Sequence, residues 1–115
     1  MLEAAFDGQS LANECERGSV DTHRVWWVQA EALLGFAHAA AKHPGRTEFR
    51  DAAAGLWRYI TEKVEDHRPG GEWFWRLDEK GEPDRSKPTV EPWKCPYHNG
   101  RMCMELIRRD PDVYV

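Results

Sequence analysis

Apolar residues recur at helical spacing over two long stretches of the chain, 25–42 and 46–66. The first stretch carries two adjoining stripes on one predicted helix, which Thr22 or Asp21 can cap. One stripe consists of Trp26, Ala30, Leu33 and Ala37, and the other of Trp27, Glu31, Leu34 and His38. A helix that is apolar on adjoining faces is typical of an inner layer, buried on most sides. A carboxylate there needs a partner or a ligand, which makes Glu31 a candidate functional residue.

The second stretch, 46–66, is apolar on one side only. Its apolar positions are Phe49, Ala52, Ala53, Leu56, Trp57, Ile60 and Val64, and the opposite side is charged, with Arg50, Arg58 and Glu62 among its members. This pattern predicts an outer helix with one face in solvent. The two helices would form an αα-hairpin of one inner and one outer helix. We therefore expect the inner stripe, Trp26 to Ala37, to be more buried than the charged side of the outer helix.

Shorter signals surround these helices. A glycine turn within 10–20 suggests one short β-hairpin, and the aromatic run 72–77, followed by the turn 78–81 and a return at 82–83, suggests a second over one end of the helices. Residues 1–6 could form the tail of a helix. A last helix is predicted from about Tyr97 to Arg109, because Pro96 suits a helix start and Pro111 a helix end. The predicted class is all-α, with one or two short β-hairpins.

Composition restricts the protein to one small domain, residues 1–115. A net charge of −4 and the absence of a basic patch argue against nucleic acid as a partner. The longest apolar stretch is too short and too polar to cross a bilayer, and the N-terminus does not resemble a signal peptide. Three cysteines at unhelpful spacings predict reduced thiols and a cytoplasmic protein.

Tryptophan is unusually frequent, with six in the chain, four of which fall in the pairs 26–27 and 73–75. Aromatic faces pack against the C–H faces of sugar rings, so tryptophans beside polar groups suggest a carbohydrate ligand. The same residues could instead fill the core of a small domain. Composition does not separate these two interpretations.

The segment 93–105 concentrates the reactive groups. Within nine residues it carries an aromatic ring, a cation, a phenol, an imidazole, an amide and a guanidinium, on Trp93, Lys94, Tyr97, His98, Asn99 and Arg101. On a helix, His98 shares a face with Arg101 and Met102. The functional interpretation is a histidine that moves protons near neutral pH. The alternatives are a structural histidine at a helix start, and a metal site of Cys95, His98 and Cys103, which lacks a fourth ligand.

Three segments together resemble the N-acylglucosamine 2-epimerase family. They are Arg24-Val-Trp-Trp-Val-Gln-Ala-Glu31, Gly71-Glu-Trp-Phe-Trp75 and Trp93-Lys-Cys-Pro-Tyr-His-Asn-Gly-Arg101. The form Lys-Cys-Pro-Tyr-His-Asn is most similar to the cellobiose 2-epimerase branch. The resemblance covers nearly the whole chain and corresponds to the C-terminal third of the family. It implies an (α/α)6 barrel with the sugar at one end, of which this chain would be the C-terminal part, with the N-terminal part missing.

The resemblance also implies roles for particular residues. His98 matches the C-terminal member of a catalytic histidine pair, and Glu31 matches a carboxylate of the sugar cleft. Trp27 and Trp93 match aromatic residues on which the sugar stacks, and Arg101 matches a cleft arginine. The implied enzyme is an isomerase that opens a mono- or disaccharide, removes the proton at C2 and returns it to the other face, without a metal or redox cofactor. From the chemistry alone, Arg101 or Lys94 could stabilise the enediolate.

One family feature has no counterpart in this chain. Inversion at C2 needs a second acid/base group, and no histidine among His23, His38, His43 and His67 stands in a matching motif. The chain is therefore expected to be a fragment that is inactive alone. Two alternatives stay open: an aldose–ketose isomerase on the same scaffold, and a non-catalytic carbohydrate-binding remnant.

Overall fold

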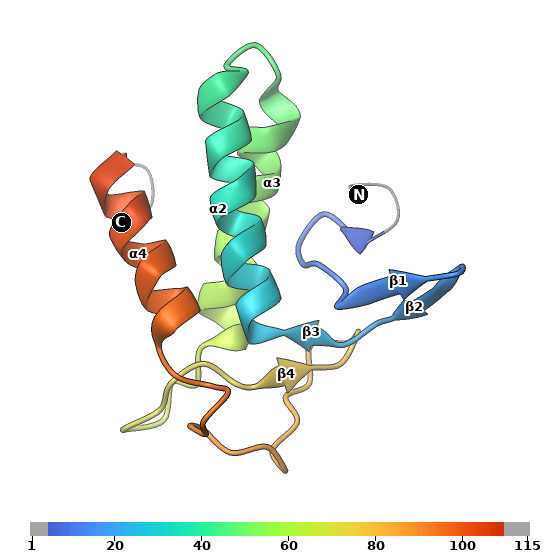
Figure 1. The fold of residues 1–115 in the computed structure, drawn as a ribbon, viewed down its shortest axis with the longest axis vertical. Coiled ribbons are helices and arrows are strands. Elements are labelled where there is room, and N and C mark those ends of the chain that lie inside the picture. The colour runs from blue at the N-terminus through green and yellow to red at the C-terminus, as the bar shows by residue number, and fades with distance from the viewer. Residues whose placement is uncertain (1–4, 110–115) are drawn as a thin grey trace.

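A computed structural model describes residues 5–109, which fold into three main helices standing on a base of short strands (Figure 1). The strands are β1 (Glu14–Glu16), β2 (Ser19–Asp21), β3 (Arg24–Val25) and β4 (Arg76–Leu77). The helices are α2 (Trp26–Lys42), α3 (Thr47–Tyr59) and α4 (Tyr97–Arg109), and the π-helical turn η1 (Ile60–Val64) continues α3. The predicted helix tail at 1–6 lies almost wholly outside the described residues.

Helix α2 is packed between its two neighbours. It runs antiparallel to α3, and α4 lies along its other side (Figure 1). Its predicted inner stripe is almost inaccessible, with Ala30 and Leu33 at 0% exposure and Trp26 at 1%. Arg50, Arg58 and Glu62 on the charged side of the second helix are exposed. The expected order of burial is confirmed. The adjoining stripe is more open than predicted, because Trp27 is 43% exposed and His38 is also exposed.

The predicted outer helix changes its winding before it ends. Regular α-helix stops at Tyr59, and the chain continues through one wider turn to Val64. Ile60 and Val64 are both at 0% exposure, so this turn stays in the core. The helical stretch is thus close to the predicted 46–66.

The N-terminal hairpin is confirmed as the antiparallel pair β1–β2. Its turn residues Arg17 and Gly18 have φ values of 50° and 81°. Left-handed backbone at both central positions is the geometry that matches the twist of a two-residue hairpin.

The second predicted hairpin is only partly correct. The turn at 78–81 forms, but the return segment makes a single bridge, between Leu77 and Pro83. The longer partner of β4 is β3, in the antiparallel pairs Arg24–Leu77 and Val25–Arg76. Pro83 has no backbone N–H, which limits the hydrogen bonds that the return segment can form with β4. Arg24 and Val25 do not have this restriction, and they lie buried beside Leu77. This small sheet lies under the start of α2, as predicted for the position of the hairpin (Figure 1).

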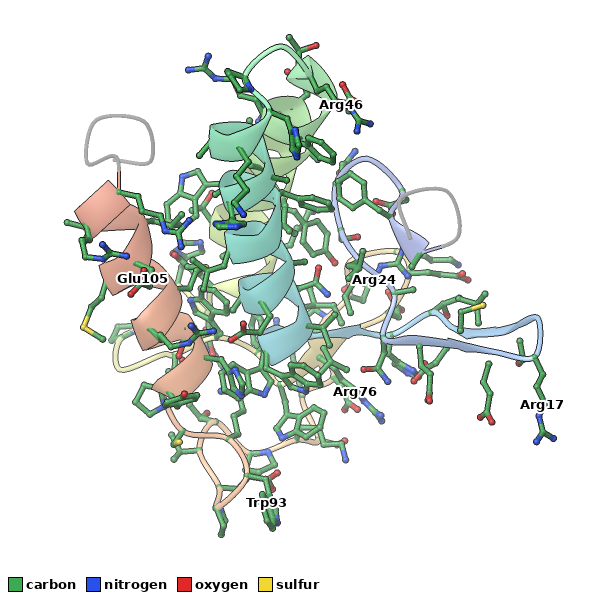
Figure 2. The ribbon with its side chains drawn as sticks, turned by 45° about the horizontal axis from the view of Figure 1, so that its top comes forward. Arg17, Arg24, Arg46, Arg76, Trp93 and Glu105 are labelled. Atoms are coloured by element: carbon green, nitrogen blue, oxygen red, sulfur yellow. The ribbon has the colours of Figure 1, made fainter. Side chains whose placement is uncertain are left out.

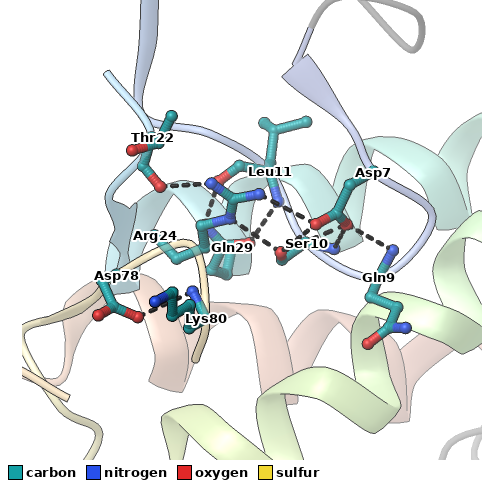
Figure 3. Close-up of polar contacts among 9 residues, drawn as sticks. All are labelled: Asp7, Gln9, Ser10, Leu11, Thr22, Arg24, Gln29, Asp78 and Lys80. Carbon is teal, nitrogen blue, oxygen red and sulfur yellow. Dashed lines mark hydrogen bonds and ion pairs between the residues drawn. The ribbon is translucent and has the colours of Figure 1, made fainter. Parts of the chain in front are cut away.

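Two buried polar side chains fix the N-terminal segment to the start of α2 (Figure 3). Gln29, at 0% exposure, accepts a hydrogen bond from the Leu11 N–H and donates one to the Leu11 carbonyl. Arg24 donates to the Ser10 hydroxyl and forms an ion pair of 3.0 Å with Asp7. These contacts satisfy polar groups that would otherwise be costly to bury.

The three helices serve to place the lower turns of α2 and α4 side by side. Within residues 5–109, no helix has the length and hydropathy needed to cross a membrane.

Candidate active site

The imidazole of His98 and the carboxylate of Glu31 meet across the interface of α4 and α2. Pro96 precedes α4, and His98 is its second residue. His98 Nδ1 lies 2.8 Å from Glu31 Oε1. The two side chains keep 33% and 31% of their surface exposed, so a ligand can reach the pair. The partner that a carboxylate on α2 requires is therefore His98, together with the arginine described next.

Arg101 binds the second oxygen of the same carboxylate. It lies one helical turn after His98, and its guanidinium donates to Glu31 Oε2 at 2.6 Å. Burial acts to raise the pKa of the Glu31 carboxyl, but the hydrogen bonds from His98 and Arg101 outweigh burial, so the pKa lies below that of an ordinary glutamate. Glu31 is thus an anion that joins two groups of α4.

The hydrogen bond to Glu31 determines which nitrogen of His98 can act as a base. A carboxylate only accepts hydrogen bonds, so Nδ1 of His98 must carry the proton that it donates. In the neutral imidazole, Nε2 then has a free lone pair. A ring held in this tautomer by a carboxylate is arranged to accept a proton at Nε2.

Aromatic rings surround the imidazole. The ring centroids of Trp26 and Trp27 each lie 5.6 Å from that of His98, and the Tyr97 ring lies 5.0 Å away at 82°. Trp26 is buried and contacts His98 edge-on, whereas Trp27 is 43% exposed. Trp27 therefore offers a free aromatic face next to the imidazole.

Two buried N–H donors, one on Trp26 and one on Arg101, have no hydrogen-bond partner within residues 5–109. They are Trp26 Nε1 and Arg101 Nε. Buried polar groups are nearly always hydrogen-bonded, so these two donors are exceptions in the described part of the chain.

The predicted site residues do not all come together. Trp27, Glu31, His98 and Arg101 form one cluster. Trp93 lies on the loop before α4, is 88% exposed and lies at the lower edge of the molecule (Figure 2). Lys94 is at 0% exposure and its amine donates to Glu72 and to the Thr89 carbonyl inside the fold, so the alternative of Lys94 as a cation facing the substrate is wrong.

A second cluster, next to His98 in the chain, was not predicted from the sequence. The Glu72 carboxylate accepts hydrogen bonds from Lys94 Nζ and from Asn99 Nδ2. No periodic signal marks Lys94 or Glu72, because both lie outside the helices. The sequence feature that could have identified them is their position in the segments 71–75 and 93–101, on which the family resemblance is based.

The other histidines are engaged elsewhere. His23 contacts Asp21, His38 contacts Arg109, His43 packs on Phe49 and His67 contacts the Thr61 carbonyl. Among the described residues, no three His, Cys, Asp or Glu side chains gather as a metal site would require. Cys95 and Cys103 are both exposed free thiols.

Glu31→Gln is expected to make the stability of the chain less dependent on acid pH. The folded-state pKa of Glu31 is lowered, so its contribution to the free energy of unfolding is present above the ordinary glutamate pKa. That contribution is lost as the pH falls through the lowered folded-state value. Urea unfolding at several pH values should show wild type more stable than the variant at pH 7, with the difference closing in acid. Glu14→Gln, on the exposed strand β1, is the matched control and should show no such closing difference.

Solved structures with a similar fold include two that are named as sugar epimerases. A sugar epimerase from a ruminal bacterium matches with a TM-score of 0.83 and 49% identity, over 90% of this chain and 26% of that one. The cellobiose 2-epimerase of Bacillus thermoamylovorans also has a TM-score of 0.83, with 46% identity over the same 90% of this chain and 26% of its own. A D-mannose isomerase, at 22% identity and a TM-score of 0.79 over 93% of this chain and 28% of that one, shares the fold. The fold is therefore that of one section of the helical sugar epimerases.

The sequence comparison then identifies the family. The family model for N-acylglucosamine 2-epimerase matches residues 7–99, and the chain belongs to that family. The cellobiose 2-epimerase of Eubacterium cellulosolvens is 52% identical over 113 residues, which are 98% of this chain and 27% of that enzyme. The cellobiose 2-epimerase of Dictyoglomus turgidum is also 52% identical, over 95% of this chain and 28% of the enzyme. The chain thus spans little more than a quarter of these relatives.

Proposed function

We propose that this chain supplies one side of the active site of a sugar 2-epimerase, with His98 as one of two acid/base groups. The observation that carries the proposal is the imidazole of His98 held by Glu31 at the exposed end of the α2–α4 interface. Relatives named as cellobiose 2-epimerases support cellobiose or a related aldose or N-acylhexosamine as the substrate class. The rest of the (α/α)6 barrel would come from the part of the relatives that this chain does not match.

In the proposed reaction, His98 acts on the open-chain form of the sugar. The C2 proton is weakly acidic because it lies next to the C1 carbonyl, and Nε2 of His98 takes it. The C–H electron pair forms the C1–C2 double bond, and the carbonyl electrons move to oxygen to give an enediolate. A proton returned to the opposite face of C2 completes the epimerisation and restores the carbonyl.

Each cluster residue has a defined part in this scheme. Glu31 keeps the proton of His98 on Nδ1 and balances the positive charge that the imidazole gains. Arg101 holds Glu31, and its side chain is 41% exposed, so the solvent-facing part of the guanidinium can donate to an oxygen of the sugar. Trp27 and the free ring of Trp93 are the surfaces proposed for stacking against the sugar rings.

The second acid/base group is proposed to come from outside this chain. None of His23, His38, His43 and His67 contacts Glu31 or His98 in the described residues. With His98 alone, the enediolate could still be reprotonated from the same face at C1. That reaction is an aldose–ketose isomerisation, which is the second candidate function, and the shared fold of the D-mannose isomerase favours its inclusion.

A chimera tests the proposal directly. The 113 matched residues would replace the matching quarter of the Eubacterium cellulosolvens enzyme, which is 52% identical over that span. Incubated with cellobiose in D2O, the chimera is expected to form the 2-epimer with deuterium at C2, because the proton removed by the base exchanges with solvent. The 115-residue chain alone should form no epimer, since it holds a base for only one face.

The outcomes separate the candidates. A ketose product would replace the epimerase assignment with the isomerase. A folded chimera that binds cellobiose but incorporates no deuterium would favour the non-catalytic carbohydrate-binding remnant. Formation of the 2-epimer by the isolated chain would show that one of its other histidines serves the second face.

A further inference from the structure

Two buried side chains on either side of His98 in the sequence share one carboxylate. Lys94 lies four residues before His98 and Asn99 lies one residue after it. Glu72, from the segment before β4, accepts from Lys94 Nζ through Oε2 and from Asn99 Nδ2 through Oε1. One carboxylate therefore ties the loop before α4 and the first turn of α4 to the same point.

The two donors of this cluster are buried, and the Lys94 amine lies near the Trp26 ring, which contacts His98. Lys94 is at 0% exposure and Asn99 at 7%, and Lys94 Nζ also donates to the Thr89 carbonyl at 2.7 Å. The Lys94 amine lies 5.2 Å from the centroid of the Trp26 ring, which contacts His98 edge-on. Burying an ammonium is costly unless it is paired and hydrogen-bonded, so the fold has a reason to keep this geometry.

We propose that Glu72, Lys94 and Asn99 form a clamp that positions His98 for its hydrogen bond to Glu31. This inference rests on the proposed function only for the role of His98 as a base. Helix ends fray, and the imidazole stands in the first turn of α4, where the helix alone constrains it least. A base displaced by about 1 Å can lose about a hundredfold in rate, which makes such a clamp chemically useful. Glu72, Lys94 and Asn99 are positioning residues.

Exchanging the donor and the acceptor tests the clamp. Asn99→Asp replaces the amide with a carboxylate of the same shape, which faces the Glu72 carboxylate and repels it. The double substitution Glu72→Gln/Asn99→Asp restores one amide and one carboxylate, with the hydrogen bond running the opposite way. Asn99→Ala removes the donor without adding charge and is a milder second variant.

The readout is the His98–Glu31 contact in the folded 115-residue chain and does not depend on activity. Carbon-13 NMR follows the titration of the Glu31 carboxyl, whose pKa is lowered by the hydrogen bonds of His98 and Arg101. Asn99→Asp should move this pKa up towards that of an ordinary glutamate and weaken the Nδ1–H signal of His98. Asn99→Ala should do the same to a smaller extent. The double variant should return both signals part of the way to their wild-type values, because it restores the amide–carboxylate pair but leaves Lys94 facing an amide.

The matched control repeats the substitution at a remote amide–carboxylate pair. Asn13 donates to Asp21 at 2.9 Å on the N-terminal hairpin, so Asn13→Asp should leave the Glu31 titration unchanged. If the cluster only stabilised the fold, the Asn99 variants would have a lower unfolding temperature but an unchanged Glu31 titration. That result would overturn the clamp. A double variant whose signals lie no closer to wild type than those of Asn99→Asp would overturn it as well. So would a wild-type chain without a protected His98 Nδ1–H. Loss of epimerase activity in the chimera, by contrast, would leave this result untouched and count against the proposed function.

Discussion

His98→Asn in the chimera is expected to lower kcat by about 10³- to 10⁴-fold, because it removes the base that takes the C2 proton. KM should change far less, since the aromatic surfaces of Trp27 and Trp93 remain. The amide introduced at position 98 can still donate to Glu31 Oε1 in place of Nδ1–H. The free energy of unfolding should therefore change by only about 1 kcal/mol. Steady-state kinetics, deuterium exchange at C2 and urea unfolding measure these effects separately.

His38→Asn is the matched control for this substitution. His38 lies on the same stripe of α2 as Glu31, is exposed, and contacts Arg109 at the other end of α4. Its replacement should leave kcat unchanged. A His98 variant that keeps the wild-type rate within about tenfold would remove His98 from the role of base, because general acid–base catalysis typically contributes more than that. An equal loss at His38 would identify it as a second participant.

The three helices could be predicted from the sequence because their signals are local. The stripe from Trp26 to Ala37 repeats at helical spacing, and Pro96 marks the start of α4 at the residue before Tyr97. The partner of Glu31 could also be anticipated in kind, since a carboxylate on an apolar helix needs a counter-group. That the partners are His98 and Arg101, which lie 67 and 70 residues away, follows only from how α4 packs on α2.

The features that the sequence did not reveal depend on distant contacts without periodicity. The pairing of β3 with β4 joins residues about fifty positions apart through two residues each, too short for any alternating pattern to develop. Lys94 follows Trp93 directly, yet Trp93 is 88% exposed and Lys94 is at 0%. In a loop, nothing in the order of residues indicates which neighbour turns inward. Here Lys94 turns inward because its amine pairs with the carboxylate of Glu72.

Glu72→Gln is expected to lower the free energy of unfolding by about 3 kcal/mol, because it leaves a wholly buried ammonium without its counter-ion. The remaining contacts of Lys94, the Thr89 carbonyl and the face of Trp26, do not carry a full negative charge. Lys94→Met should cost less, since the Glu72 side chain is 23% exposed and keeps its hydrogen bond from Asn99. Urea unfolding at pH 7 measures both changes.

The double variant Glu72→Gln/Lys94→Met should recover most of the stability lost in Glu72→Gln. It removes both charges and keeps the approximate volume of both side chains, and replacement of a buried ion pair by neutral groups of similar shape is often close to neutral. The pair Arg76–Asp84 provides the matched control, because its side chains are 32% and 25% exposed at a distance of 2.9 Å. Arg76→Met should cost about 1 kcal/mol or less, as expected for an ion pair that water screens. A Glu72→Gln variant no less stable than Arg76→Met would show that Lys94 reaches solvent, and a double variant no more stable than Glu72→Gln would show that the two charges do not interact.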